Sequence, residues 1–177
     1  MKKYIFIVVG LFIFISIANE IYTQVNKKDA KSKRVECQEH STMFEKVVNK
    51  ELLNTLQKSL KSGSVDVEVT AQKSTYMKSK LFEYVKESDI KDNFLKLVNK
   101  NRDTKATAKV DILIYENDKK DPGKKTAKSK LYAGYLVLSF NIQSTLVYKI
   151  QIDFMDDKGR DVQRVLECAL NSAKTIK

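Results

Sequence analysis

The sequence is poor in the residue types that most catalytic and metal sites require. Its 177 residues include one histidine, two cysteines, one proline, five glycines and no tryptophan. A hydrolytic triad would have to use His40 as its base, and no glycine-flanked serine, phosphate-binding glycine loop or paired-histidine motif is present. An acid-pair glycosidase stays open at this stage, because carboxylates far apart in the chain can meet in space. We therefore expect a protein that acts by binding, without enzyme activity, cofactor or metal.

The scarcity of proline and glycine also leaves few linkers, and no internal repeat is visible. Hydrophobic residues make up 42% of the chain and charged residues 31%, which is typical of a globular domain and not of a disordered chain. The length suits one domain with a sizeable core and is short for two. The formal net charge of +11 predicts attraction to anionic surfaces.

The N-terminus has the pattern of an export signal. Lys2 and Lys3 precede an apolar run over residues 4–18, and Ser16-Ile17-Ala18 supplies small residues where a signal peptidase cleaves. We expect a signal peptide at 1–18, cleaved after Ala18. The alternative is an uncleaved membrane anchor over 4–22. Both topologies export the remainder of the chain. After cleavage it would be periplasmic or extracellular, and with an uncleaved anchor it would stay attached to the inner membrane.

The two cysteines then predict a disulfide. We expect a flexible polar lead-in at 19–36 and a single domain at 37–177, so that a bond between Cys37 and Cys168 would close almost the whole domain. On the chain-entropy model it would contribute at most about 5 kcal/mol. The alternative is a metal or thiolate site, because Cys37 and His40 would share a helical face. No fourth ligand is evident, and we favour the disulfide.

Periodicity predicts the elements of the first half. Thr42 and Glu45 form a capping-box pattern, and apolar residues then recur every four positions up to Gly63, which predicts one amphipathic helix that includes Phe44 and Val48 in its buried stripe. Strict alternation over 65–70 predicts a half-exposed strand. A helical period returns over residues 75–98, as one kinked helix or as two segments divided near Ser88-Asp89.

The second half is richer in strands. We expect strands over 110–115, 131–143 and 145–154, with a hairpin around Gln143-Ser144, and a last helix. The expected fold class is α+β, with a mostly antiparallel four-stranded sheet and helices packed on one face. The last helix buries one apolar stripe and leaves Cys168 at its edge; the stripe consists of Val162, Val165, Leu166, Ala169, Leu170 and Ala173.

Residues 116–130 form a long basic segment between two expected strands. A turn at Asp121-Pro122-Gly123 marks its tip. The segment is either solvated surface or a contact for an anionic group, such as lipid phosphate, a wall polymer or an acidic partner. Lysine supplies its charge, which favours diffuse attraction over bidentate recognition. The candidate contact residues are Lys119, Lys120, Lys124, Lys125, Lys128 and Lys130.

These observations lead to a functional expectation by elimination. We expect an exported binding protein of the envelope that engages a protein partner, as an inhibitor, an immunity-type neutraliser or a subunit of an assembly. The alternative is a binder of a lipid or an anionic small ligand or polymer, held between the helices and the sheet. Tyr132 and Tyr135 follow the basic segment and could stack on bases, but no nucleic-acid motif accompanies them, so we do not expect nucleic acid.

Overall fold

A computed structural model of the chain describes residues 35–99 and 105–177. Residues 40–177 form one compact unit, and the described residues 35–39 belong to a separate N-terminal unit. The predicted signal at 1–18 lies outside the described residues, as does all of the predicted lead-in except its last two residues. None of the helices in the described ranges has the length and apolar content needed to cross a bilayer.

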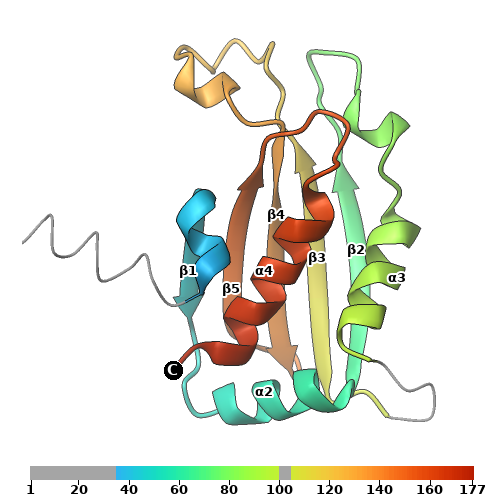
Figure 1. Cartoon of the computed structure of the whole chain (residues 1–177), viewed down its shortest axis with the longest axis vertical. Helices are drawn as coiled ribbons and strands as arrows, with labels where there is room; N and C mark the ends of the chain where they lie inside the picture. Colours follow the sequence, from blue (N-terminus) through green and yellow to red (C-terminus); the bar gives the residue numbers. More distant parts are fainter. Residues whose placement is uncertain (1–34, 100–104) are drawn as a thin grey trace, which may run out of the picture. The chain divides into compact units, whose positions relative to one another are not determined.

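The unit at 40–177 is built on a five-stranded mixed sheet with the order β1-β5-β4-β3-β2. Strands β2 and β3 are parallel, and the other neighbouring pairs are antiparallel. Strand β4 is therefore central, and β1 and β2 are the two edges (Figure 1). The strands are β1 Met43–Val47, β2 Val65–Gln72, β3 Ala108–Glu116, β4 Gly134–Ile142 and β5 Thr145–Phe154.

Three α-helices cover one face of this sheet (Figure 1). They are α2 Leu53–Ser62, α3 Glu87–Leu97 and α4 Val162–Thr175. Short 3-10 helices are present at η1 Glu36–His40, η2 Leu81–Glu83 and η3 Lys128–Lys130. The helix α3 belongs to the connection between the parallel strands β2 and β3, which a short turn could not join.

The core lies between the helices and the sheet. Alternate residues of β3 and β4 are buried, and the residues between them are half-buried or exposed on the opposite face. This alternation follows from the period of two in a strand whose one face is covered. The largest fully buried side chains include Phe94 of α3, Phe140 of β4 and Phe154 of β5.

The expected fold class is confirmed only as α+β, because the sheet has five mixed strands and not four mostly antiparallel ones. The first correction concerns the helix predicted from Thr42. Residues 43–47 form the edge strand β1 on β5, and α2 begins only at Leu53. Phe44 is 64% exposed and Val48 49% exposed, so neither belongs to a buried stripe. The apolar spacing of four reflects only residues close together in the chain. Pairing with β5 gives residues 43–47 tertiary contacts that override this local helical preference.

The second correction concerns residues 75–98. The expected helical stripe there is broken into an irregular loop, the 3-10 helix η2 and α3. The two-segment alternative was therefore nearer the structure, but α3 starts at Glu87 and no side chain caps it. The connection carries the chain back along the sheet, which makes β2 and β3 parallel.

Several local predictions are confirmed. Gln143 and Ser144 form the β4–β5 turn with positive φ angles of 49° and 71°, which suits a tight hairpin. Gly63 ends α2 in the left-handed conformation with φ 71°. The predicted apolar stripe of α4 is buried throughout, and Cys168, predicted at the edge of that stripe, is itself only 2% exposed.

The disulfide is also confirmed: Cys37 and Cys168 are bonded to each other. Cys37 lies in η1 and not in an α-helix. Because both sulfurs are consumed by this bond, neither is a thiolate that could ligate a metal or act as a nucleophile. The alternative reading of Cys37, His40 and Cys168 as a metal or nucleophile site is therefore wrong.

Candidate binding surface at the loop end

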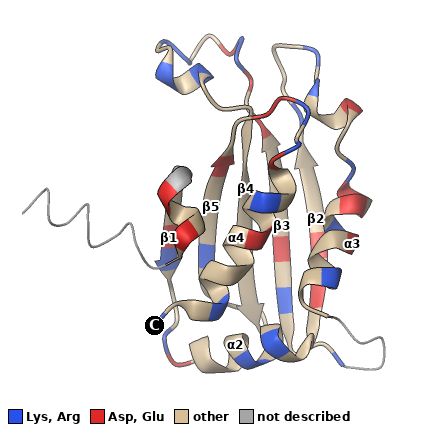
Figure 2. Ribbon diagram, in the orientation of Figure 1, with Lys and Arg blue, Asp and Glu red and all other residues tan. Residues whose placement is uncertain are grey.

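Three loops leave the same end of the sheet (Figure 1). Residues 73–80 follow β2, residues 117–133 join β3 to β4, and residues 155–161 follow β5. We call these three segments the loop end. The basic segment predicted from sequence makes up most of the middle loop, and Figure 2 shows further lysine and arginine positions on the other two.

The base of the loop end is a buried carboxylate, Glu116, at the last position of β3. Its side chain accepts hydrogen bonds from four groups of the neighbouring loop. Oε1 accepts from the amides of Lys80 and Leu81 at 2.7 and 2.9 Å. Oε2 accepts from the amide and the hydroxyl of Ser74 at 3.2 and 3.1 Å. One side chain thus holds both ends of loop 73–80.

Asp118 holds the middle of the same loop. Its Oδ2 accepts hydrogen bonds from the amides of Thr75 and Tyr76 at 2.6 and 2.5 Å, and the residue is 4% exposed. Its Oδ1 accepts from the amide of Lys120 at 3.3 Å. A carboxylate that accepts several amide bonds is a rigid anchor, because charge-assisted bonds are shorter and stronger than neutral ones.

Between these two carboxylates, Asn117 faces the longer loop. Its Nδ2 donates to the carbonyls of Ser129 and Tyr132 at 3.1 and 2.8 Å. Its Oδ1 accepts from the ammonium of Lys124. The three consecutive residues Glu116, Asn117 and Asp118 therefore organise both loops from one strand end, and the loop end is preorganised.

The same bonds set the pKa values of the two acids. Burial raises the pKa of Glu116, but hydrogen bonds from the Leu81 and Lys80 amides outweigh it, and the net pKa lies below its ordinary value. Burial likewise raises the pKa of Asp118, and the amides of Tyr76 and Thr75 bring its net pKa below the ordinary value. Both groups are carboxylates at neutral pH.

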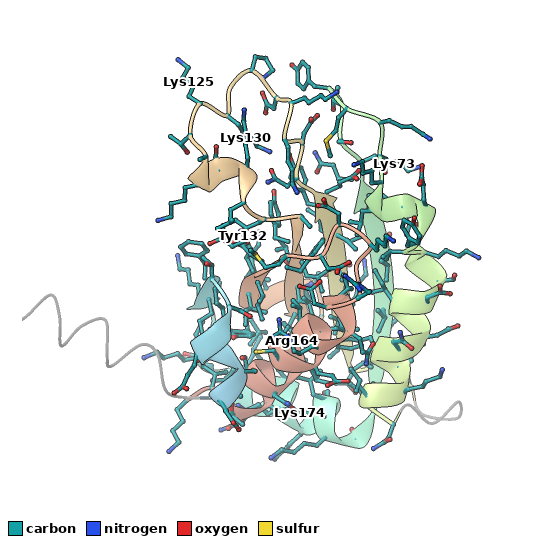
Figure 3. The ribbon with its side chains drawn as sticks, turned by 45° about the horizontal axis from the view of Figure 1, so that its top comes forward. Lys73, Lys125, Lys130, Tyr132, Arg164 and Lys174 are labelled. Atoms are coloured by element: carbon teal, nitrogen blue, oxygen red, sulfur yellow. The ribbon has the colours of Figure 1, made fainter. Side chains whose placement is uncertain are left out.

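The structure divides the six predicted contact lysines into two groups. Lys119 and Lys124 turn inward: the Lys119 ammonium lies 2.7 Å from Asp157 Oδ1, and the Lys124 ammonium lies 5.8 Å from the Tyr115 ring centroid. Lys119 therefore ties two loops together, and Lys124 ties its loop to the end of β3. The other four are exposed, and Figure 3 shows Lys125 at the outer edge of its loop, Lys130 on the same loop and Lys73 on the neighbouring loop. The four exposed lysines are Lys120, Lys125, Lys128 and Lys130.

Exposed apolar side chains accompany these lysines. Tyr76, Leu131 and Met155 come from the three different loops of the loop end, and each is 49% to 59% exposed. The Ala133 amide donates to the Phe154 carbonyl at 2.9 Å, which brings the segments carrying Leu131 and Met155 together. Exposed apolar residues within a charged rim are typical of an interaction surface.

A basic cleft opens beside this surface. Its volume is about 490 Å³, and it is lined by Lys78, Lys80, Glu83, Tyr84, Asp157 and Lys158. The Lys158 ammonium lies 5.5 Å from the Tyr84 ring centroid, and Glu83 is paired with Lys78 at 3.1 Å. The cleft could hold one anionic group beside an aromatic ring.

The two tyrosines that follow the basic segment have separate roles. The Tyr132 hydroxyl lies 2.7 Å from the hydroxyl of Thr42, just before β1. Tyr135 stacks on Tyr115 with 4.5 Å between the ring centroids. Tyr135 is therefore one half of an internal pair on the open side of the sheet, and not a free platform for a base.

Sequence reasoning found the basic segment but missed its anchor. No role was predicted for Glu116, Asn117 and Asp118, which stand at the end of an alternating strand. The available signal was their position, since polar side chains at the end of a core strand commonly bond the loops that leave it. Within residues 35–99 and 105–177, no three histidine, cysteine, aspartate or glutamate side chains come together as metal ligands.

No protein-family model matches the chain, and neither a curated protein nor a solved structure matches it significantly.

Proposed function

We propose that the protein is an exported, non-enzymatic binding module that engages an acidic surface of a protein partner through its loop end. The observation that carries this proposal is the combination of three apolar side chains and four exposed lysines on loops held by Glu116, Asn117 and Asp118. Export rests on the apolar N-terminal run of the sequence.

The apolar side chains and the lysines would make different contributions to binding. Tyr76, Leu131 and Met155 would be removed from water in a complex, which supplies affinity. The surrounding lysines would attract an acidic partner and orient its approach, which supplies association rate and selectivity. Because the buried carboxylates already order the loops, less conformational entropy is lost on binding. An inhibitor, a neutraliser or an assembly subunit would each use such a surface.

The test is affinity capture from envelope extracts with the exported chain, its disulfide intact, as bait. A matched pair of charge-reversed baits decides the result. Lys120→Glu, Lys125→Glu and Lys128→Glu together alter the loop end, and Lys50→Glu, Lys58→Glu and Lys61→Glu alter exposed positions in and next to α2. We expect one partner that survives a high-salt wash on the wild type and on the α2 bait, and is lost from the loop-end bait.

Two results would contradict the proposal. In one, all three baits retain the same partner, so that the loop end has no part in binding. In the other, the wild type retains only diverse acidic material that leaves with salt, as expected of nonspecific attraction.

The cleft of Lys78, Lys80 and Lys158 favours a second candidate function, the binding of an anionic small ligand or lipid headgroup. It is lined by residues of the loops and of η2 with its flanking residues, and not by residues of the sheet. Native mass spectrometry separates the two functions: a ligand carrier should be purified with a bound molecule that Lys80→Ala with Lys158→Ala releases, whereas a protein-binding module should be empty.

A further inference from the structure

The face of the sheet opposite the helices has an ordered distribution of charge. Five side chains, one from each strand, lie in register across this face, because each is the paired neighbour of the next. In the order of the sheet from β2 to β1 they are Glu68, Asp111, Ser139, Lys149 and Lys46. Two acids thus stand on one side of the central strand β4, two lysines stand on the other, and a neutral serine lies between them.

The wider charges preserve this asymmetry. On the acidic side, Lys109 bridges the two acids, with its ammonium 2.7 Å from Glu68 Oε2 and 2.9 Å from Asp111 Oδ1. Asp66, paired with Lys109 across the strands, adds a third carboxylate, so the acidic side remains net negative. These side chains stay accessible, since that of Glu68 is 63% exposed and that of Asp111 42% exposed. Figure 2 shows acidic segments on β2 and β3 and basic segments on β1 and β5, with a basic segment also on β3 and an acidic one at the end of β5. The β5 acid, Asp153, lies on the same face as Lys149, and with Lys46 and Lys149 the basic side keeps a net positive charge.

Two features of this face are unfavourable in an isolated domain. Lys46 and Lys149 are directly opposed on β1 and β5, and like charges at such positions repel each other. Phe44, in the next row on β1, is 64% exposed. No helix in the described part of the chain covers this face (Figure 1). A partner that places acidic side chains beside the two lysines and covers the Phe44 ring would relieve the charge repulsion and remove the exposed apolar surface from water.

We propose that the open face of the sheet is a dimer interface that binds the same face of a second copy of this chain. The two-fold axis lies between the two sheets and runs parallel to β4. A rotation about an axis parallel to the strands exchanges the two sides of the sheet. It places Glu68 opposite Lys46 of the second copy and Asp111 opposite its Lys149, and the same contacts recur in the other direction. An axis perpendicular to the strands would stack acidic side on acidic side, so the charges select the first arrangement.

The next row is compatible with this packing. It consists of Thr70, Leu113, Val137, Gln151 and Phe44, again one residue from each strand in register. The same rotation sets Val137 near its own copy and Phe44 over Thr70 of the second copy. Stacked sheets lie about 10 Å apart with strands about 30° from alignment. Five strands and four open rows give a face on the order of 600 Å², near the roughly 800 Å² per partner of a standard interface.

Analytical ultracentrifugation of the exported chain with its disulfide intact tests the proposal. We expect a reversible dimer for the wild type. Lys46→Glu with Lys149→Glu makes both sides negative, and Glu68→Lys with Asp111→Lys makes both sides positive. Each double variant alone should dissociate at least tenfold more readily, whereas an equimolar mixture should form a heterodimer, because each acidic side then meets a basic one.

Controls separate the effect of this interface from effects of folding and of net charge. Lys58→Glu with Lys61→Glu changes the net charge by the same amount as Lys46→Glu with Lys149→Glu, but on α2. This control variant should dimerise as the wild type does. Circular dichroism checks that each variant is folded. If Glu68→Lys with Asp111→Lys does not fold, Glu68→Gln with Asp111→Asn replaces it and should still prefer the acidic variant in a mixture. A monomeric wild type, dimers in both reversed variants, or a mixture that does not associate would each overturn the proposal.

Discussion

Glu116 is a buried residue that fixes the position of exposed residues on a neighbouring loop. It ends a core strand, it is 2% exposed, and its carboxylate bonds both ends of loop 73–80. The exposed residues of that loop, among them Tyr76, depend on this anchor for their position. Charged residues near the surface thus fall into two classes in this protein: buried acids that order the loops, and exposed lysines that face solvent.

We predict that Glu116→Gln lowers the free energy of unfolding by about 2 kcal/mol at neutral pH, because charge-assisted bonds to the amides are lost. The pKa of Glu116 is lower in the folded state, so its contribution is full above the ordinary pKa of a glutamate and is lost as pH falls through the folded pKa. The difference from wild type should therefore shrink in acid. Urea titrations across pH measure it.

Glu83→Gln is the matched control for that experiment. Glu83 also carries an ion pair, with Lys78, but both side chains are largely exposed. Surface pairs of this kind contribute less than about 1 kcal/mol. An equal loss in both variants, or a Glu116 variant as stable as the wild type, would show that the buried carboxylate does not anchor the loop.

Gly134 carries a second prediction at the residue scale. A Cβ added there would lie 2.1 Å from the carbonyl oxygen of Tyr115 and 2.5 Å from Cζ of Phe154. We expect Gly134→Ala to destabilise the fold by about 1–3 kcal/mol, as overpacking does. Gly123→Ala, whose Cβ would meet only the flexible Asp121 side chain at 3.2 Å, should change stability little. Thermal unfolding of the two variants side by side is the measurement, and a tolerated Gly134→Ala would contradict the tight packing at the start of β4.

At the scale of elements, three backbone amides on the outer side of the edge strand β2 are protected. The amides of Val65, Val67 and Ala71 are each bonded, to the Gly63 carbonyl, Asp66 Oδ1 and Glu87 Oε1 respectively. Unpaired amides on an edge strand invite addition of another chain, and native proteins block them. The group that blocks the Ala71 amide is the carboxylate of Glu87 in the first turn of α3. The helix therefore protects the edge of the strand on which it packs.

We predict that Glu87→Ala increases aggregation, because it frees the Ala71 amide on the sheet edge. Light scattering during prolonged incubation below the unfolding temperature measures it. Asp89→Ala is the control, since Asp89 also lies in the first turn of α3 and interacts with the helix dipole, but Asp89 makes no bond to β2 that the structure shows. Equal aggregation of the two variants would assign the effect to the helix and not to the edge.

At the scale of the whole molecule, the disulfide links two residues far apart in the chain, Cys37 and Cys168. Within the described residues, the five strands and three α-helices all lie in 40–177, so the elements of the core do not include Cys37. The bond acts on the unfolded chain by closing a loop between Cys37 and Cys168, whose entropy loss the chain-entropy model describes.

We predict that Cys37→Ser with Cys168→Ser retains the fold and loses up to about 5 kcal/mol of stability. Reduction of the wild type should reproduce the loss, and reductant should leave the double variant unchanged. Circular dichroism and thermal unfolding with and without reductant measure both effects. A wild type whose unfolding temperature is insensitive to reduction would contradict a stabilising role of the bond.

Local pattern was sufficient for some parts of this protein. The alternation of β2, β3 and β5, the apolar stripe of α4 and the Gln143-Ser144 turn were all predictable, because each depends on residues close together in the chain. The pairing of Cys37 with Cys168 was predictable for another reason: an exported chain with two cysteines leaves one choice.

Contacts distant in sequence decided the rest. Residues 43–47 became a strand because β5, about a hundred residues later, offered an edge for pairing, and a helical spacing of four could not reveal that partner. Which lysines turn inward depended on Asp157 and Asn117 being close in space. The row from Glu68 to Lys46 exists only once the register of five strands is set. Periodicity is a property of neighbouring residues, whereas strand order, register and the direction of side chains depend on the packed chain as a whole.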